Sequence, residues 1–305
     1  MFAGRIRSDP ADFRVDELLS IDFSGEGEHD WLRIEKTGAN THWVAEQFAR
    51  HANVPVRDVG FSGLKDRHAI TTQWFSVRRK IREPTDWSCF EAEGVRLLET
   101  RVHNRKLNRG THRGNAFRIA VRASSDLETH RNDIAERLET LRERGVPNYF
   151  GEQRFGRDGG NLELGRAIVA GRRMSRAKRS IGISALRSFE FNSALETRVR
   201  DGTWNALIAG DVANLDGSGS MFAVDEMTAE LDARCARLDI HPTGELPAIS
   251  KLGVKVSHRP LRMRIDELRW ELSEDTLLLE FRLGKGSYAT AVLREIVRVA
   301  PATDH

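Results

Sequence analysis

Residues 63–77 read Gly63-Leu64-Lys65-Asp66-Arg67-His68-Ala69 followed by Ile70-Thr71-Thr72-Gln73-Trp74-Phe75-Ser76-Val77. Gly60 and Gly63 permit tight backbone turns, so the first part is expected to form a loop. In the second part, residues 73–78 alternate apolar with polar or aromatic side chains, a two-residue period that predicts a half-buried strand. Asp66 is therefore expected on a loop at the mouth of a strand, where a rigid scaffold often carries chemistry.

Two interpretations of Asp66 follow from its local chemistry. A turn aspartate commonly bonds its own backbone, and the flanking cations would then be solvated surface groups. Alternatively, the neighbouring cations Lys65 and Arg67 keep the carboxylate ionised and ready to act as a nucleophile or base. The local residues alone leave both interpretations open.

Two further segments carry multi-residue motifs in the same chain order. The first reads His112-Arg113-Gly114-Asn115-Ala116-Phe117, and the second reads Asn148-Tyr149-Phe150-Gly151-Glu152-Gln153-Arg154-Phe155-Gly156. Together with Gly-Leu-Lys-Asp-Arg-His-Ala, they resemble the signatures of the TruD family of tRNA pseudouridine synthases. Weaker likeness extends from Pro10-Ala11-Asp12-Phe13 to Gly286-Ser287-Tyr288-Ala289-Thr290, so the resemblance covers nearly the whole chain.

The resemblance implies an α+β fold in two parts. A pseudouridine-synthase catalytic domain with a mixed, largely antiparallel sheet is expected over residues 1–147 and 255–305. A more helical TRUD domain is expected as an insertion over residues 148–254. The residue patterns agree with this division, because strand periods dominate both ends of the chain and helical periods dominate the middle.

Individual elements follow from the same periods. We predict strands at residues 13–16 (the first strand), 31–36, 73–78, 117–122, 261–265 and 276–283. We predict helices at residues 41–50, 127–141, 162–170, 185–200 and 289–296, the last of which closes the chain. Residues 148–160 are expected to form an extended loop.

The resemblance also assigns roles to single residues. It implies that Asp66 is the catalytic aspartate and that Phe117 stacks on the target base. Asn115 matches a family residue near the aspartate and is expected to fix its loop. From the residues alone, Phe117 also suits an ordinary core position at the start of an apolar strand face.

Three further residues are assigned to the substrate site by resemblance. Tyr288 lies where family members carry phenylalanine, and the exchange keeps the ring but adds a hydroxyl. Lys65 belongs to the motif, and Arg7 aligns with a basic family position that pairs with the carboxylate. Exposed cations are commonly just solvated surface, and that alternative stands for Lys65 and Arg7.

Composition limits the remaining possibilities. The 305 residues are 39% hydrophobic and 30% charged, typical of a globular chain with a real core. No apolar run reaches the roughly 20 residues that span a bilayer, and residues 1–7 lack the apolar stretch of a signal peptide. With only Cys89 and Cys235, no disulfide framework is implied, and we expect a cytoplasmic protein without membrane contact.

Cofactor motifs are also missing from the sequence. The ten histidines are scattered and the two cysteines lie far apart, so no ligand spacing indicates a metal. No glycine-rich phosphate loop follows a predicted strand, so no nucleotide cofactor is expected. Pseudouridine formation is an isomerisation in which uracil leaves its ribose, turns and rejoins through a carbon. It needs no cofactor, and we therefore expect none.

Positive charge is segregated although the net charge is only +3. Residues 100–125 and residues 164–189 contain no acid, and each stretch carries seven lysines or arginines. Residues 246–265 form a third acid-free basic stretch. This arrangement suits a polyanion such as RNA. The alternative is that about half of these cations pair with acids distant in sequence.

The leading hypothesis is a tRNA pseudouridine synthase, which by family resemblance isomerises the uridine at position 13 and is expected to act as a monomer. The rival is a non-catalytic RNA-binding or RNA-folding protein that keeps the scaffold. A metal- or methyl-donor-dependent modifying enzyme is disfavoured because no motif provides its site.

The charge pattern yields a first test. Changing Arg172, Arg173 and Arg176 together to Ala should weaken tRNA binding and flatten its dependence on salt, because each phosphate contact releases counterions. Binding titrations at several salt concentrations measure both effects. An unchanged salt slope would mean that this cluster does not contact RNA.

Overall fold

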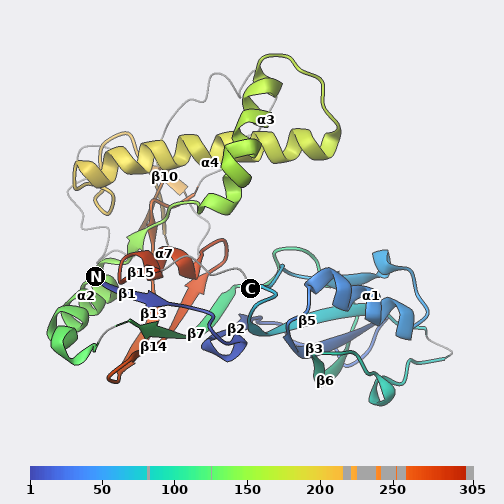
Figure 1. Ribbon diagram of the computed structural model, residues 1–305. Helices are drawn as coiled ribbons and strands as arrows, with labels where there is room; N and C mark the ends of the chain where they lie inside the picture. Colours follow the sequence, from blue (N-terminus) through green and yellow to red (C-terminus); the bar gives the residue numbers. More distant parts are fainter. Residues whose placement is uncertain are drawn as a thin grey trace. The chain divides into compact units, whose positions relative to one another are not determined.

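The strand predicted after the Asp66 loop is β5 (Ile70–Arg78), and it lies inside a large mixed sheet (Figure 1). A computed structural model describes residues 1–80, 83–124, 126–215, 221–224, 238–241, 252 and 259–299. The other strands of this sheet are β1 (Phe2–Arg5), β2 (Phe13–Leu18), β3 (His29–Thr37), β4 (Val59–Phe61), β6 (Val95–His103), β7 (Gly114–Ala123), β13 (Asp266–Leu272), β14 (Thr276–Gly284) and β15 (Val297–Val299).

The order along the sheet is β13-β14-β7-β2-β5-β3-β6. β1 pairs with both β7 and β15, and β4 pairs with β5. The β2–β5 and β1–β15 pairs are parallel, whereas the other pairs of this sheet are antiparallel. The predicted mixed, largely antiparallel sheet is therefore confirmed.

Strand β5 is buried on both faces, so the prediction of a half-buried strand was wrong. Its residues from Thr71 to Val77 are all buried. On one face, Phe75 packs against Phe48 with ring centroids 5.3 Å apart. On the other face, Trp74 packs in a cluster with Trp31 and Leu107. Trp74 lies on the face of β5 that was expected to meet water. Apolar clusters therefore cover both faces of this strand.

Helix α1 (Thr41–His51) covers one face of β5 and β3, as Figure 1 shows. Val44 and Phe48 point inward and are fully buried, as their four-residue spacing predicts. Asn40 has the extended backbone of an N-cap but makes no side-chain capping bond. The Thr41 hydroxyl instead donates to the Gln73 side chain at 3.1 Å, which ties the start of the helix to β5.

The chain divides into two compact units. The first unit contains Met1–Leu138, Ile265–Ala289 and Ile296–His305, and the second contains Glu139–Arg264 and Thr290–Glu295. The predicted insertion at residues 148–254 has its C-terminal boundary outside the described residues, and its assignment as a separate domain stays a prediction.

The second unit combines two helices with short strands. Its described elements, together with the two helices α2 and α7 that bridge the unit boundaries in sequence, are α2 (Arg131–Arg144), β8 (Val146–Pro147), α3 (Gly160–Val169), α4 (Arg176–Arg200), β9 (Val212–Leu215), β10 (Met221–Ala223), β11 (Leu238–His241), β12 (Arg262–Met263) and α7 (Ala289–Arg294). Its core gathers Leu195 of α4 with Leu207, Ala213, Val224 and Leu261.

Several element boundaries differ from the predictions. Helix α4 begins at Arg176 rather than 185, because Ser175 caps its first turn by accepting from the Lys178 backbone. Residues 148–160 contain two short 3-10 helices, Glu152–Phe155 and Arg157–Gly159, and not a purely extended loop.

The ends of the main sheet also differ. Of the predicted strand at 261–265, only Arg262–Met263 forms a strand, β12, which pairs with β8, and β13 begins just after it at Asp266 and pairs with β14. β1 precedes the expected first strand, and β15 follows the helix expected to close the chain. Both are too short to show a two-residue period, and they pair with one another.

None of the helices in the described part of the chain combines the length and apolar character that crossing a bilayer requires.

Helices α3 and α4 approach closely at two glycines, which gives a test of the second unit. A Cβ added at Gly165 would lie 2.5 Å from the Gly182 carbonyl oxygen. Gly165→Ala should therefore destabilise the protein by about 1–3 kcal/mol through overpacking. Urea denaturation followed by the helical circular dichroism signal measures this loss.

Gly160→Ala is the matched control, because it lies in the same helix and an added Cβ there meets nothing within 4 Å. It should be neutral or slightly stabilising, since alanine restricts the unfolded chain. Equal stabilities for the two variants would show that the helices do not meet at Gly165.

Candidate active site around Asp66

The loop that carries Asp66 joins β4 to β5, and three neighbouring elements hold its main chain. The Gly63 carbonyl accepts from Gln73 of β5 at 3.3 Å. The Lys65 backbone N–H donates to the Thr41 hydroxyl of α1 at 3.0 Å. The Asp66 carbonyl accepts from Lys36 of β3 at 2.8 Å. These three hydrogen bonds attach the main chain of the loop to β5, α1 and β3.

The Asp66 carboxylate points outward and pairs with Arg7. A guanidinium nitrogen of Arg7 lies 2.7 Å from Oδ2 of Asp66, and the two side chains are 31% and 54% exposed. Arg7 also covers the Phe13 ring, 4.2 Å from its centroid. Arg7 has a φ of 61°, a left-handed conformation that is uncommon for a residue with a side chain. The site thus holds a partly accessible carboxylate beside an oriented cation.

Lys65 points in the opposite direction, into the protein. Its Nζ lies 3.1 Å from Glu17 Oε2 and donates to Asn115 Oδ1 at 2.8 Å. The Lys65 and Glu17 side chains are only 5% and 0% exposed. The other Glu17 oxygen accepts from the Trp74 backbone N–H at 3.1 Å. Lys65 is therefore a buried anchor of the loop and not a solvated surface cation.

Lys36 is a second buried cation beneath the loop. Its side chain is fully buried, and its Nζ donates to the Asp66 carbonyl. Burial lowers the pKa of Lys36 from 10.5 to about 8, although the Asp66 carboxylate opposes this shift. The Lys36 ammonium is thus held near Asp66 at the expense of its own hydration.

Sequence reasoning missed Lys36 and Glu17, but the strand periods contain a signal for both. Lys36 continues the inward series of Leu32 and Ile34, and Glu17 continues the inward series of Phe13 and Val15. A charge at the inward phase of an otherwise apolar strand face is rare and needs a partner. Both partners lie far away in sequence, and therefore the signal gives no hint of their identity.

Phe117 and Asn115 lie on one face of β7, two residues apart. The Phe117 ring stacks on Phe281 at 5.3 Å and meets Phe13 edge-on at 6.3 Å. Phe117 is only 9% exposed. Since Phe13 also lies under Arg7, a chain of contacts leads from Phe117 through Phe13 and Arg7 to Asp66. The structure thus brings five of the six predicted site residues into one connected cluster.

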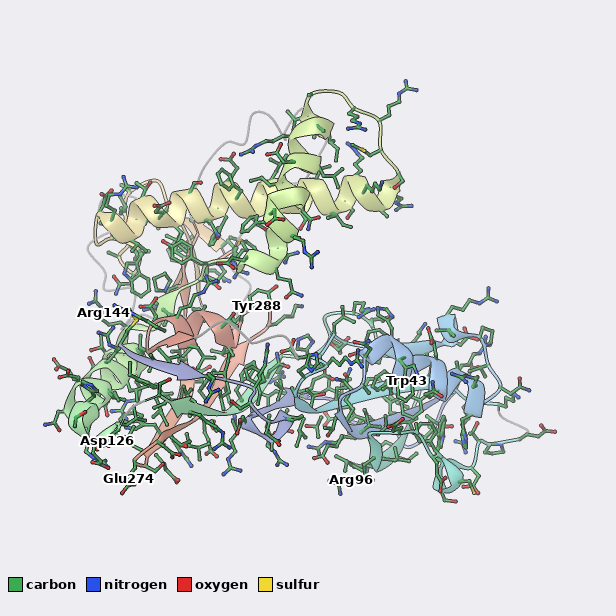
Figure 2. All side chains as sticks on the ribbon, in the orientation of Figure 1. Trp43, Arg96, Asp126, Arg144, Glu274 and Tyr288 are labelled. Atoms are coloured by element: carbon green, nitrogen blue, oxygen red, sulfur yellow. The ribbon has the colours of Figure 1, made fainter. Side chains whose placement is uncertain are left out.

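Tyr288 is the sixth predicted site residue. It directly precedes α7 and is labelled in Figure 2. The residue is 43% exposed. Its assignment to the substrate site still rests on the family resemblance.

The loop between β6 and β7, residues 104–113, carries several cations and contacts the Asp66 loop at Ser62. The Ser62 hydroxyl accepts from the His112 backbone N–H at 2.8 Å, and Ser62 Oγ lies 2.6 Å from His112 Nδ1. Burial and the nearby Lys65 ammonium lower the pKa of His112. In the same loop, Arg109 lies over the Phe61 ring at 3.6 Å. The Gly110 carbonyl of this loop accepts from Lys285, which follows β14, at 2.8 Å.

Some cations of the first basic stretch are neutralised by acids, as the alternative interpretation anticipated. Arg101 pairs with Glu99, Arg118 with Glu280, and Arg122 with Asp12. Arg105, Arg109 and Arg113 are exposed. Of these three, Arg109 and Arg113 lie next to Gly110 and His112, whose backbone N–H groups donate to Ser62 beside the Asp66 loop.

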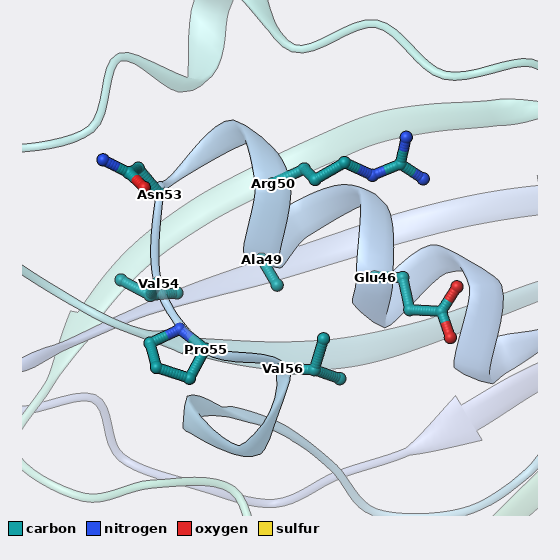
Figure 3. A pocket seen from close by; sticks show the side chains of 7 residues that line it. All are labelled: Glu46, Ala49, Arg50, Asn53, Val54, Pro55 and Val56. Carbon is teal, nitrogen blue, oxygen red and sulfur yellow. The ribbon is translucent and has the colours of Figure 1, made fainter.

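A hollow on the surface of the first unit lies away from these residues. Figure 3 shows this hollow of about 460 Å³ between the end of α1 and the turn around Pro55, lined by Glu46, Ala49, Arg50, Asn53, Val54, Pro55 and Val56. It contains none of the predicted site residues. Within the described part of the chain, no three histidine, cysteine or acidic side chains gather as metal ligands would.

One known protein family matches this chain over most of its length. The family model described as tRNA pseudouridine synthase D (TruD) matches residues 2–182 and 245–296. The chain therefore belongs to the TruD family.

Several relatives cover nearly the same length. tRNA pseudouridine synthase D of Methylococcus capsulatus is 42% identical to this chain, over 98% of it and 92% of the relative. The proteins of the same name from Psychrobacter arcticus and Azotobacter vinelandii are 40% and 41% identical, and they cover 94% and 95% of this chain and 88% and 90% of their own length.

A solved structure supports the fold. The crystal structure of the putative tRNA pseudouridine synthase D from Methanosarcina mazei matches with a TM-score of 0.75 at 21% identity, over 98% of this chain and 94% of that one. This confirms the predicted α+β pseudouridine-synthase fold.

The buried lysine generates a pH test. Because the folded pKa of Lys36, about 8, lies below the unfolded value of 10.5, the unfolded chain binds more protons between these values. The contribution of Lys36 to stability should therefore increase with pH across this window. Relative to Lys36→Met, the wild type should gain up to about 1.4 kcal/mol per pH unit. Urea denaturation at a series of pH values measures this difference.

Lys178→Met serves as the control, because Lys178 is an exposed lysine on α4. Its difference from the wild type should stay flat over the same pH range. If Lys36→Met followed the wild type in parallel at every pH, the claim of a buried ammonium with a lowered pKa would fail.

Proposed function

We propose that this chain converts uridine in tRNA to pseudouridine, and that the uridine at position 13 is its target. Membership of the TruD family supports the reaction, and the names of its relatives support tRNA as the substrate. The position within tRNA rests on the resemblance alone. The proposal extends to Asp66 as the catalytic residue.

The Arg7–Asp66 pair is the observation that carries the proposal. Its carboxylate is 54% exposed while the groups that hold its loop are buried, so it is both rigid and accessible. A single carboxylate suffices for the isomerisation, by attacking the ribose or by removing a ribose proton. Arg7 holds the carboxylate in one orientation for either route through its 2.7 Å contact with Oδ2. We propose that the reaction proceeds without metal or cofactor.

The remaining site residues take supporting roles. We assign Lys65 and Asn115 to positioning, since both bond within the buried network under the loop. Phe117 is assigned to the target base by the family resemblance, although its ring is nearly buried between Phe13 and Phe281. Tyr288 is assigned to substrate binding by the family resemblance, and its exposure is compatible with that role.

The RNA must be held over a wider surface. Bases inside a helix cannot react, and the target must leave its stack to reach Asp66. Arg109 and Arg113 supply exposed positive charge beside the site, and Arg172, Arg173 and Arg176 supply it in the second unit. We propose that residues 148–254 form the inserted TRUD domain and that the protein acts as a cytoplasmic monomer.

A non-catalytic RNA-binding protein on the same scaffold is the rival. It would need the basic surface but not an accessible, oriented carboxylate. The Arg7–Asp66 geometry therefore favours the enzyme. RNA binding without isomerisation would favour the rival.

Asp66→Asn tests the catalytic assignment, because it keeps the shape and removes the charge. Folding should survive, since the Asp66 side chain is exposed and its loop is held through the main chain. tRNA binding should survive because phosphate contacts supply most of the affinity. Isomerisation should fall by about 10³-fold or more. Single-turnover tritium release from uracil-labelled tRNA measures the rate.

Two comparison variants sharpen this test. Asp22→Asn makes the same change at an exposed aspartate and should retain the wild-type rate. Phe117→Leu keeps an apolar side chain in the sheet but removes the ring, so activity should fall partly, by about 1–3 kcal/mol of lost stacking. Wild-type turnover by folded Asp66→Asn would end the assignment of this loop as the active site.

A further inference from the structure

The Asp66 loop carries an apolar side chain that the reaction does not explain. Leu64 is 63% exposed, more than any other large hydrophobic side chain in the described residues. It lies two residues before Asp66. Single exposed leucines are common on protein surfaces, so the position of Leu64 beside the Asp66 carboxylate matters more here than its exposure alone.

Leu64 is presented rigidly. The residue before it is held through the Gly63 carbonyl by Gln73. The residue after it is held through the Lys65 backbone by Thr41 and through its side chain by Glu17 and Asn115. Side chains of β5 and α1 thus hold the main chain on both sides of Leu64, and β2 and β7 hold the Lys65 side chain, while the Leu64 side chain is exposed.

The surroundings of Leu64 are polar and basic, not apolar. Arg67 and His68 follow it on the loop and are exposed. The adjoining loop reaches Gly63, where an added Cβ would lie 3.3 Å from His112, and it carries exposed Arg109 and Arg113. Protein partners prefer a contiguous apolar patch, whereas a single apolar side chain among cations fits a nucleic acid, whose bases are apolar on their faces and whose phosphates are anionic.

We propose that Leu64 enters the RNA base stack and fills the gap that the target uridine leaves when it turns into the Asp66 site. This inference rests on the proposed function and specifies how the same site gains access to its base. Taking a base out of its stack costs free energy, and an apolar wedge between the neighbouring bases offsets that cost. Leu64 is a positioning residue in this role, since Asp66 performs the chemistry.

The first experiment compares single-turnover rates on folded tRNA. Leu64→Ala should lower the rate by about 10- to 100-fold, as expected when the burial of one leucine side chain is lost. Leu64→Met, which keeps a long apolar side chain, should restore most of the rate. Leu98→Ala makes the same substitution at another exposed leucine, on β6, and should match the wild type.

The second experiment separates a wedge from a residue that merely shapes the loop. On a short single-stranded RNA with an unstacked target uridine, Leu64→Ala should approach the wild-type rate, because nothing needs to be displaced. A loop-shaping role would instead lower the rate on both substrates, and that result would overturn the proposal.

The third experiment observes the base stack directly. In the Asp66→Asn background, where chemistry is blocked, binding of tRNA with 2-aminopurine beside the target uridine should raise fluorescence. Adding Leu64→Ala should reduce this rise, and adding Leu98→Ala should not. Equal fluorescence rises for the variants with added Leu64→Ala and with added Leu98→Ala would overturn the proposal that Leu64 enters the base stack. Failure of the wild type to isomerise any tRNA would refute the proposed function itself, an outcome that the Leu64 variants cannot produce.

Discussion

The ion pair between Lys65 and Glu17 is the contact on which the site depends. Both side chains are nearly or fully buried, and burying two charges costs more than their attraction commonly returns. The pair is therefore better understood as a device for position than as a source of stability. It ties the Asp66 loop to β2, to Asn115 of β7 and to the Trp74 backbone of β5. Removing either partner would leave a charge buried without compensation.

Charge is divided between the inside and the outside of this loop. Lys65 belongs to the loop and turns its ammonium inward to Glu17, and Lys36 donates to the Asp66 carbonyl from beneath. The side chains of Asp66 and Arg7 face outward. A cation buried next to a carboxylate loses hydration, as the lowered pKa of Lys36 indicates. The same low exposure leaves the loop little freedom to move, so that Asp66 is accessible without being mobile. Such preorganisation would serve the proposed reaction, in which the Asp66 carboxylate acts alone.

Most elements of the fold were predictable because their apolar residues repeat at clear periods. Phe117, Ile119 and Val121 on β7 and Val44 and Phe48 on α1 face the core as their spacing predicts. The errors arose where tertiary contacts override local pattern. The face of β5 that carries Trp74 was expected to meet water, but Trp31 and Leu107 cover it. β1 and β15 are too short to show a period and exist because they pair with each other.

The amino-acid sequence by itself determined where the proposed site lies, since the segment around Asp66 and the segment with Asn115 and Phe117 are each continuous motifs. It did not determine how Lys65 is used, which only the tertiary structure decided. Residues 17, 36, 65 and 115 are separated along the chain, and the β7-β2-β5-β3 order of strands brings them together. Local patterns report which side chains turn inward, but the partner of an inward charge is chosen by strand pairing, and strand pairing is a property of the whole sheet.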